Sequence, residues 1–230
     1  MAQEIIIYHG SEKIIETPIY GEGRKNNDFG LGFYCTEYEN LAKEWAVSSL
    51  RDGFSNCYKI DIEFLNILNL NSSKYTILNW IAILVEHRLF SLKTPNARKA
   101  RQYLIDNFSI NVNSYDIIIG YRADDSYFDY AEAFLNNSIT VDQLARAMQL
   151  GKLGEQIVIK SKYAFSKLQF QKFDLALKDE FYLLRKSRDE DANNHYFQIL
   201  EEENNGLYIQ EIIKGDIKND DPRIPRNIFK

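Results

Sequence analysis

The sequence predicts a domain of the α+β class, and three observations lead to this prediction. Runs of consecutive apolar residues, such as those within 3–9 and 115–120, are typical of buried β-strands. Between residues 73 and 92 the apolar side chains recur every three or four positions, which indicates a helix packed on a core. With 230 residues and 45% hydrophobic composition, the chain can bury a sizeable core without disulfides or a structural metal.

The first half of the chain is expected to contain four strands and one helix. The isoleucines of 3–9 form a strand that Gly10 and Ser11 end. A polar connection rich in glycine follows over 12–31, and we expect it to be a loop over a ligand groove. The next expected elements are a strand over 33–36, a helix over 39–50, and strands over 57–62 and 67–70.

The second half is expected to begin with two helices inserted between strands. They cover 73–92 and, after Thr94-Pro95, the residues up to about 107. The elements expected after them are a central strand over 115–120, a helix ending near 135, a helix from 140 to 150 opened by a capping box at Thr140 and Gln143, and a strand over 155–159, for which 168–173 is a candidate partner.

The composition changes near residue 174. Residues 179–203 contain many charged side chains, which predicts a long helix exposed to solvent. Its narrow apolar stripe consists of Phe181, Leu184, Tyr196 and Leu200. A short strand or helix over 207–213 and an extended tail from 219 are expected to follow. We therefore divide the chain into a domain over 1–173 and a C-terminal helical extension over 174–230, which either docks on its own domain or receives a partner protein.

Charge and cysteine content exclude several classes. A net charge of -5 argues against a broad basic surface for non-specific nucleic-acid binding. Cys35 and Cys57 form neither a CxxC motif nor a Cys/His cluster, so we expect no disulfide framework and no metal site. The N-terminus does not resemble a cleaved signal, and the apolar stretch 77–85 is too short to span a bilayer. We expect a cytoplasmic protein that does not enter membranes.

Two short motifs carry the candidate chemistry. The glycine-rich stretch 26–32 runs into the short aromatic strand of Phe33 and Tyr34, and its glycines permit positive φ and close approach of a ligand. Upstream, His9 lies at the end of the first expected strand. Each motif alone is more typical of a hairpin turn or of a core histidine. Together they indicate a binding site.

The combination of "YHGS" with "RKNNDFGLGFYCTEYENLAKEWA" resembles the NAD-binding half of ADP-ribosyltransferases of the His-Tyr-Glu class, which is diphtheria-toxin-like and poly(ADP-ribose) polymerase-like. It is closer still to a bacterial family of uncharacterised ADP-ribosyltransferase-like proteins, often encoded in toxin–antitoxin pairs. The resemblance covers about residues 4–173. It implies an ADP-ribosyltransferase-like fold, with a split, strongly twisted pair of β-sheets, helical insertions and a C-terminal helical extension.

The resemblance also implies roles for residues of these motifs. His9 would bond the ribose next to adenine, and the backbone of Gly10 would bind the nicotinamide carboxamide. Tyr34 matches the motif tyrosine. Trp45 lies eleven residues later, where the polymerase-like relatives have an aromatic that stacks on nicotinamide, although an aromatic on such a helix is more often part of the core. Ala42 stands where the polymerases have a serine, which removes one hydrogen bond.

Three further residues are expected to contact NAD. Ser11 and Gly32 belong to the same two motifs. Arg24, with its neighbour Lys25, could neutralise the pyrophosphate.

The third motif of the class is a catalytic glutamate that leads an apolar strand. In the stretch 155–159 the aligned residue is Gln156, which can hydrogen-bond a ribose hydroxyl but carries no negative charge. Strand alternation sends Glu155 to the opposite face, and we choose Gln156 as the third catalytic residue beside His9 and Tyr34. The alternatives are that Glu155 is the motif residue, or that both are solvated residues at a strand end.

Asp124 and Asp125 follow the central strand at 115–120. A carboxylate there would either position an acceptor nucleophile or cap the next helix.

The resemblance therefore implies an enzyme that transfers ADP-ribose from NAD to a macromolecule, with NAD as substrate and no metal. The acceptor is protein, RNA or DNA, and the physiological role expected from the resemblance is the toxin of a bacterial toxin–antitoxin or phage-defence pair, with an antitoxin protein as partner. Two alternatives remain open at this point: a non-catalytic module that binds NAD or a partner, and an NAD glycohydrolase.

Overall fold

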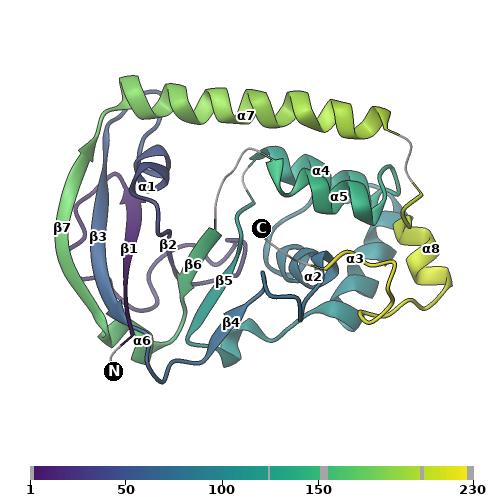
Figure 1. Ribbon diagram of the computed structural model, residues 1–230, viewed down its shortest axis with the longest axis horizontal. Coiled ribbons are helices and arrows are strands. Elements are labelled where there is room, and N and C mark those ends of the chain that lie inside the picture. Colours follow the sequence, from purple (N-terminus) through teal and green to yellow (C-terminus); the bar gives the residue numbers. More distant parts are fainter. Residues whose placement is uncertain (1–2, 124, 151–154, 203–204, 227–230) are drawn as a thin grey trace.

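The computed structural model of the protein describes residues 3–123, 125–150, 155–202 and 205–226. It is a mixed α+β structure with two β-sheets, as expected (Figure 1). The first sheet is antiparallel with the order β1-β3-β7. Its strands are β1 (Glu4–Ser11), β3 (Gly53–Asp61) and β7 (Leu168–Ala176).

The second sheet has four strands in the order β2-β6-β5-β4. They are β2 (Phe33–Cys35), β6 (Glu155–Ile159), β5 (Ile117–Tyr121) and β4 (Ile67–Asn69), and only β4 and β5 run parallel. The two sheets meet where the Tyr8 N–H donates to the Thr36 carbonyl at 2.7 Å and the Thr36 N–H donates back at 2.9 Å. The apolar layer between the sheets includes Ile7, Cys35, Tyr58, Ile60, Ile117, Ile157 and Ile159.

A larger core lies among helices packed around the second sheet. These helices are α2 (Ile77–His87), α3 (Pro95–Phe108), α4 (Asp125–Leu135), α5 (Val141–Ala147) and α8 (Ile209–Lys214). All residues of α2 from Ile77 to Val85 are buried, so this helix is the centre of the core rather than an amphipathic cover. The short 3₁₀ turn η1 (Val112–Ser114) leads from α3 to β5.

Helix starts follow the capping signals in the sequence. The Thr140 and Gln143 side chains form the expected capping box at α5, and Thr94 caps α3 ahead of Pro95. Such caps satisfy N–H groups that the first helical turn leaves without a partner.

The remaining helices belong to the side of the first sheet. α1 (Glu39–Ala46) packs on β1 and β3, and α6 (Lys162–Ser166) separates β6 from β7. α7 (Lys178–Glu201) runs along the top of Figure 1 from the first sheet to the helical half of the molecule. A bidentate ion pair between Arg188 of α7 and the buried Glu44 of α1, with N–O distances of 2.7 and 3.1 Å, fixes α7 to α1.

The structure corrects three expectations and decides a fourth that was open. The candidate pairing of 168–173 with 155–159 is wrong, because α6 turns the chain away and β7 pairs with β3 instead. The helix expected over 39–50 ends at Ala46, since Val47 is already extended. Leu184 and Leu200 of the expected stripe on α7 are exposed, and the residues that α7 buries are Phe181, Ala192 and Ile199. Of the strand and the helix that were alternatives over 207–213, the structure shows a helix, α8, and its residues Ile209 and Ile212 enter the main core.

Candidate functional site

One cleft brings most of the predicted site residues together. It has a volume of about 520 Å³ and lies where β1, β2, α1, β6 and α7 approach the connection between β1 and β2. The expectation that this connection covers a groove is confirmed, because Ile15, Pro18, Ile19, Glu22, Gly23 and Asn27 line the cleft. The predicted site residues that line it are His9, Gly10, Gly32, Tyr34, Trp45 and Gln156.

Tyr34 holds the shape of the glycine-rich loop. Its hydroxyl donates to the Gly30 carbonyl at 2.6 Å and accepts from the Phe29 N–H at 3.1 Å. Gly30 has φ of 72°, and a Cβ there would lie 2.8 Å from the His87 ring, so only glycine fits. Burial, together with the charge of Asp28, raises the pKa of Tyr34, so the hydroxyl keeps its proton.

Lys160 braces the same loop from the other side. Its ammonium group donates to the carbonyls of Phe29 and Leu31 at 2.8 and 2.7 Å. Burial lowers the pKa of Lys160 to about 8. Hydrogen bonds from the Tyr34 hydroxyl and the Lys160 ammonium group to backbone carbonyls of the loop therefore hold it in this shape.

His9 presents a neutral imidazole to the cleft. Its Nδ1 lies 2.7 Å from the Tyr34 carbonyl, and because a carbonyl only accepts, Nδ1 carries the proton. The ring stacks on Phe33 with centroids 4.2 Å apart. Burial lowers the pKa of His9, and the bond to Tyr34 opposes part of this shift. Nε2 is then an acceptor, suited to a hydroxyl group of a ligand.

Gly10 places a stretch of backbone at the wall of the cleft. The N–H and C=O of Tyr8 point toward Thr36, away from β3. Gly10 lies two residues further along β1, so its N–H and C=O point to the same side as those of Tyr8. The backbone groups of Gly10 are therefore not used in pairing with β3. A Cβ at Gly10 would lie 2.0 Å from the Ala42 carbonyl of α1. Glycine is thus required for α1 to approach β1, and the approach buries Ala42 completely.

Trp45 of α1 contributes a flat apolar surface. The guanidinium carbon of Arg122, which follows β5, lies 4.3 Å from the centre of its ring. This is close enough for a cation–π contact. One face of the indole therefore carries a positive charge in the structure.

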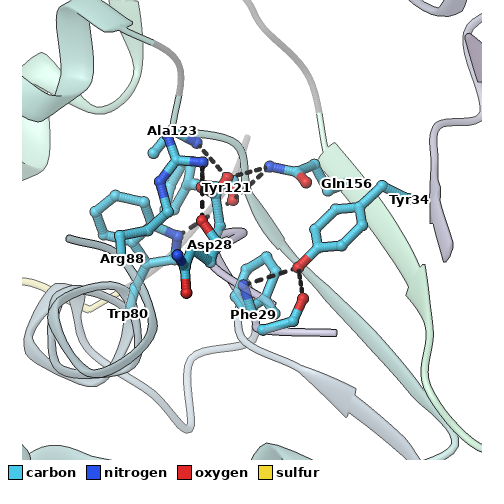
Figure 2. A network of polar contacts seen from close by, with 10 residues as sticks. Asp28, Phe29, Tyr34, Trp80, Arg88, Tyr121, Ala123 and Gln156 are labelled. Carbon is cyan, nitrogen blue, oxygen red and sulfur yellow. Dashed lines mark hydrogen bonds and ion pairs between the residues drawn. The ribbon is translucent and has the colours of Figure 1, made fainter. Parts of the chain in front are cut away.

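Gln156 and Asp28 form a buried pair at the base of the cleft (Figure 2). Gln156 is 3% exposed, and its Nε2 donates to Asp28 Oδ2 at 2.7 Å and approaches the Tyr121 carbonyl at 3.5 Å. Asp28 Oδ2 also accepts from the Ala123 N–H at 2.9 Å, and Oδ1 lies 3.6 Å from Arg88 Nη1. Burial raises the pKa of Asp28, against the effect of these donors and of Arg122.

Two residues of the predicted site fall elsewhere. Ser11 and Arg24 are not among the described residues that line the cleft. The Ser11 hydroxyl binds the Lys13 carbonyl and accepts from Asn56, and Arg24 is exposed. Glu155 is also not among the described lining residues, in agreement with strand alternation. Asp124 lies outside the described residues, and Asp125 is the first residue of α4.

The structure adds four residues that sequence reasoning missed. Asp28 lies inside the glycine-rich motif, where a carboxylate between asparagine and phenylalanine was a visible signal. Arg88, Arg122 and Arg185 line the cleft from the end of α2, the end of β5 and the first third of α7. Nothing local in the sequence marks these arginines, because only the tertiary fold brings them together.

No group of three or more His, Cys, Asp or Glu side chains among the described residues is placed to hold a metal ion. Within the same residues, none of the helices combines the length and apolar character needed to cross a membrane.

The comparisons with known proteins give one match. A family model described as "Protein of unknown function (DUF3990)" matches residues 5–170, which is more than half of the chain. No match is found among curated proteins or among solved structures. The matched region ends within β7, so Arg185 lies beyond it.

Proposed function

Because the chain belongs to the DUF3990 family, whose description names no activity, we propose from the cleft itself that the protein is an NAD-dependent ADP-ribosyltransferase. One observation carries the proposal: His9, Gly10, Tyr34, Trp45 and Gln156, which come from four separate elements, line the same space. A volume of about 520 Å³ lies in the range of sites that enclose small ligands and cofactors. The two sheets joined at β1 and β2 support an ADP-ribosyltransferase-like fold.

The groups around the cleft complement the parts of NAD. The carboxamide of nicotinamide offers an NH2 group as donor and a carbonyl oxygen as acceptor, which matches the C=O and N–H of Gly10. The His9 Nε2 accepts from a ribose hydroxyl, and the indole of Trp45 provides a surface for a flat ring. Arg88, Arg122 and Arg185 supply the positive charge that a pyrophosphate requires, and they take the role expected of Arg24.

The reaction breaks the bond between the nicotinamide nitrogen and ribose C1′. The electron pair of this bond goes to the pyridinium nitrogen, so nicotinamide leaves as a neutral molecule and the ribose becomes oxocarbenium-like. An acceptor hydroxyl, amine or ring nitrogen then forms a new bond to C1′ and releases its proton to solvent. The protein holds the ribose and the leaving group in place and stabilises the positive charge that develops.

The acceptor and the biological setting follow from the resemblance. We propose a macromolecular acceptor, either protein, RNA or DNA, and a toxin whose activity an antitoxin protein restrains in a toxin–antitoxin or phage-defence pair. Arg185 of α7 lines the cleft, so an antitoxin bound along α7 would lie next to this residue.

One observation favours a second candidate. The residue at the position of the class glutamate is an uncharged amide, buried and with its nitrogen engaged by Asp28 and Tyr121. A site without a carboxylate at this position is consistent with a module that binds NAD without cleaving it.

Calorimetry with NAD and assay of released nicotinamide separate these candidates. An ADP-ribosyltransferase should release nicotinamide, and the release should accelerate when a cell extract supplies the acceptor. A glycohydrolase releases nicotinamide at the same rate without the extract, and a binding module gives heat of binding without release. Arg185→Ala should weaken NAD binding about tenfold or more, and Arg24→Ala is the matched control that leaves binding unchanged. Absence of NAD binding in the wild-type protein would contradict the proposal.

A further inference from the structure

Asp28 is an unusual residue to find at the base of a cleft. It is 4% exposed, yet it lines the cavity together with Gln156 and Arg88. Ionisable side chains are seldom buried to this degree unless partners compensate for the loss of water. Here the partners are two N–H donors on Oδ2 and the guanidinium of Arg88 beside Oδ1. The sequence thus places one solvent-shielded carboxylate on the wall of the candidate site.

Gln156 is oriented by this carboxylate. Asp28 Oδ2 and the Tyr121 carbonyl are both acceptors, so the amide must turn its nitrogen toward them. Figure 2 shows the amide nitrogen on the side of Asp28 and the amide oxygen on the side away from it. The oxygen of Gln156 is therefore held as a fixed acceptor, and the carboxyl group of Asp28 lies at the nitrogen end of the same amide.

The pair also explains why a glutamate does not suit position 156. A carboxylate there would stand within hydrogen-bond distance of the Asp28 carboxylate, since the present N–O distance is 2.7 Å. Two buried carboxylates at such a distance cannot both ionise without a large electrostatic cost. Residues 28 and 156 thus accommodate one negative charge between them.

We propose that Asp28 is the anionic catalytic residue of the site, which supplies from the glycine-rich loop the charge that position 156 lacks. This inference rests on the proposed function and deepens it. In the reaction described above, Asp28 stabilises the positive ribose as the bond from C1′ to nicotinamide breaks, and Gln156 accepts a hydrogen bond from a ribose hydroxyl. Asp28 neither forms nor breaks a bond, and the proton of the acceptor still leaves to solvent.

Exchange of the two residues tests the proposal. The proteins compared are the wild type, Asp28→Asn, Gln156→Glu and the double variant Asp28→Asn/Gln156→Glu. The double variant reverses the pair, because the amide introduced at position 28 can donate to a carboxylate at position 156. Nicotinamide release from NAD, with water as acceptor, gives kcat and KM for each protein, and Arg24→Ala serves as a surface control.

Asp28→Asn should lower kcat about 100-fold with KM changed less than threefold, because the charge acts on the transition state. Gln156→Glu should also lose activity, and the double variant should recover at least tenfold over Asp28→Asn. A purely structural role for Asp28 predicts instead that folded Asp28→Asn retains the wild-type kcat. That result, or a folded double variant no more active than Asp28→Asn, would overturn the inference.

A measurement of stability keeps the proposal testable if Asp28→Asn does not fold. In Gln156→Glu the paired carboxylates have a raised folded-state pKa, so this variant should lose stability relative to wild type as pH rises from 5 to 8. Equal pH dependence in the two proteins would show that no charge lies at Asp28, and would overturn the inference. A wild-type protein that neither binds NAD nor releases nicotinamide refutes the proposed function as well, whereas an active wild type with an equally active Asp28→Asn refutes the inference alone.

Discussion

Loss of the ion pair between Arg188 and Glu44 should destabilise the protein measurably. Glu44 is 3% exposed, and two nitrogens of Arg188 contact its two oxygens at 2.7 and 3.1 Å. Arg188→Met keeps an unbranched apolar stem but removes the guanidinium, and so leaves Glu44 buried without this partner. Removal of one member of a buried pair costs about 3–5 kcal/mol. The Arg188 side chain is itself 26% exposed, so solvent reaches the pair and we expect about 2–3 kcal/mol.

The assay is thermal unfolding followed by circular dichroism, with urea unfolding as a second measure. For a chain of this length, a loss of about 2–3 kcal/mol corresponds to a fall in Tm of about 5–10 °C. The double variant Glu44→Gln/Arg188→Met removes both charges and should recover part of this loss, because no buried charge is left unpaired. A fall below about 2 °C, or a double variant as unstable as the single one, would refute the view that the pair fixes α7 to α1.

Three further predictions follow from the cleft. Gly10→Ala should lower stability by about 1–3 kcal/mol, read from the urea midpoint, because the new Cβ would lie 2.0 Å from the Ala42 carbonyl; an unchanged midpoint would contradict the close packing of α1 on β1. NAD should quench tryptophan fluorescence through Trp45, and Trp45→Phe should remove most of the quench while the buried Trp80 keeps the background emission; a quench that survives shows that Trp45 does not touch the ligand. Burial lowers the pKa of His9, so the unfolded chain binds a proton before the folded one as pH falls below about 6.5. The free energy of unfolding should therefore decline from about pH 6.5 downward. His9→Gln should make this decline smaller in urea titrations at about pH 5 and 7.

The elements of the fold were predictable where the signal is local. The helices α3 and α5 begin where Thr94-Pro95 and Thr140–Gln143 predict, since caps act within one turn. Strand alternation, which is equally local, placed Gln156 and Glu155 on opposite faces, and the alignment with the family motif chose Gln156 for the cleft. The pairing of 168–173 was wrong because the hydrophobic pattern of a strand does not specify its neighbour, which here is β3, more than one hundred residues earlier.

The candidate site was predictable only in part, for the same reason. His9, Tyr34 and Trp45 belong to contiguous motifs with a recognisable order. Arg88 and Arg185 approach the cleft through the packing of α2 and α7, which no short window of sequence encodes. Asp28 lay within the motif, but its importance depends on a bond to Gln156, 128 positions away in the chain.

α7 connects the first sheet to the helical half of the molecule. At its start the Lys178 N–H donates to Asp52 next to β3, and near its end the Ile199 carbonyl accepts from Gln143 of α5 at 3.1 Å. With 24 residues it is about 36 Å long, and a helix of this length resists bending. The two halves therefore cannot separate by a hinge motion while both ends of α7 stay attached to them. We therefore expect any widening of the cleft to come from movement of the connection between β1 and β2, whose residues line it.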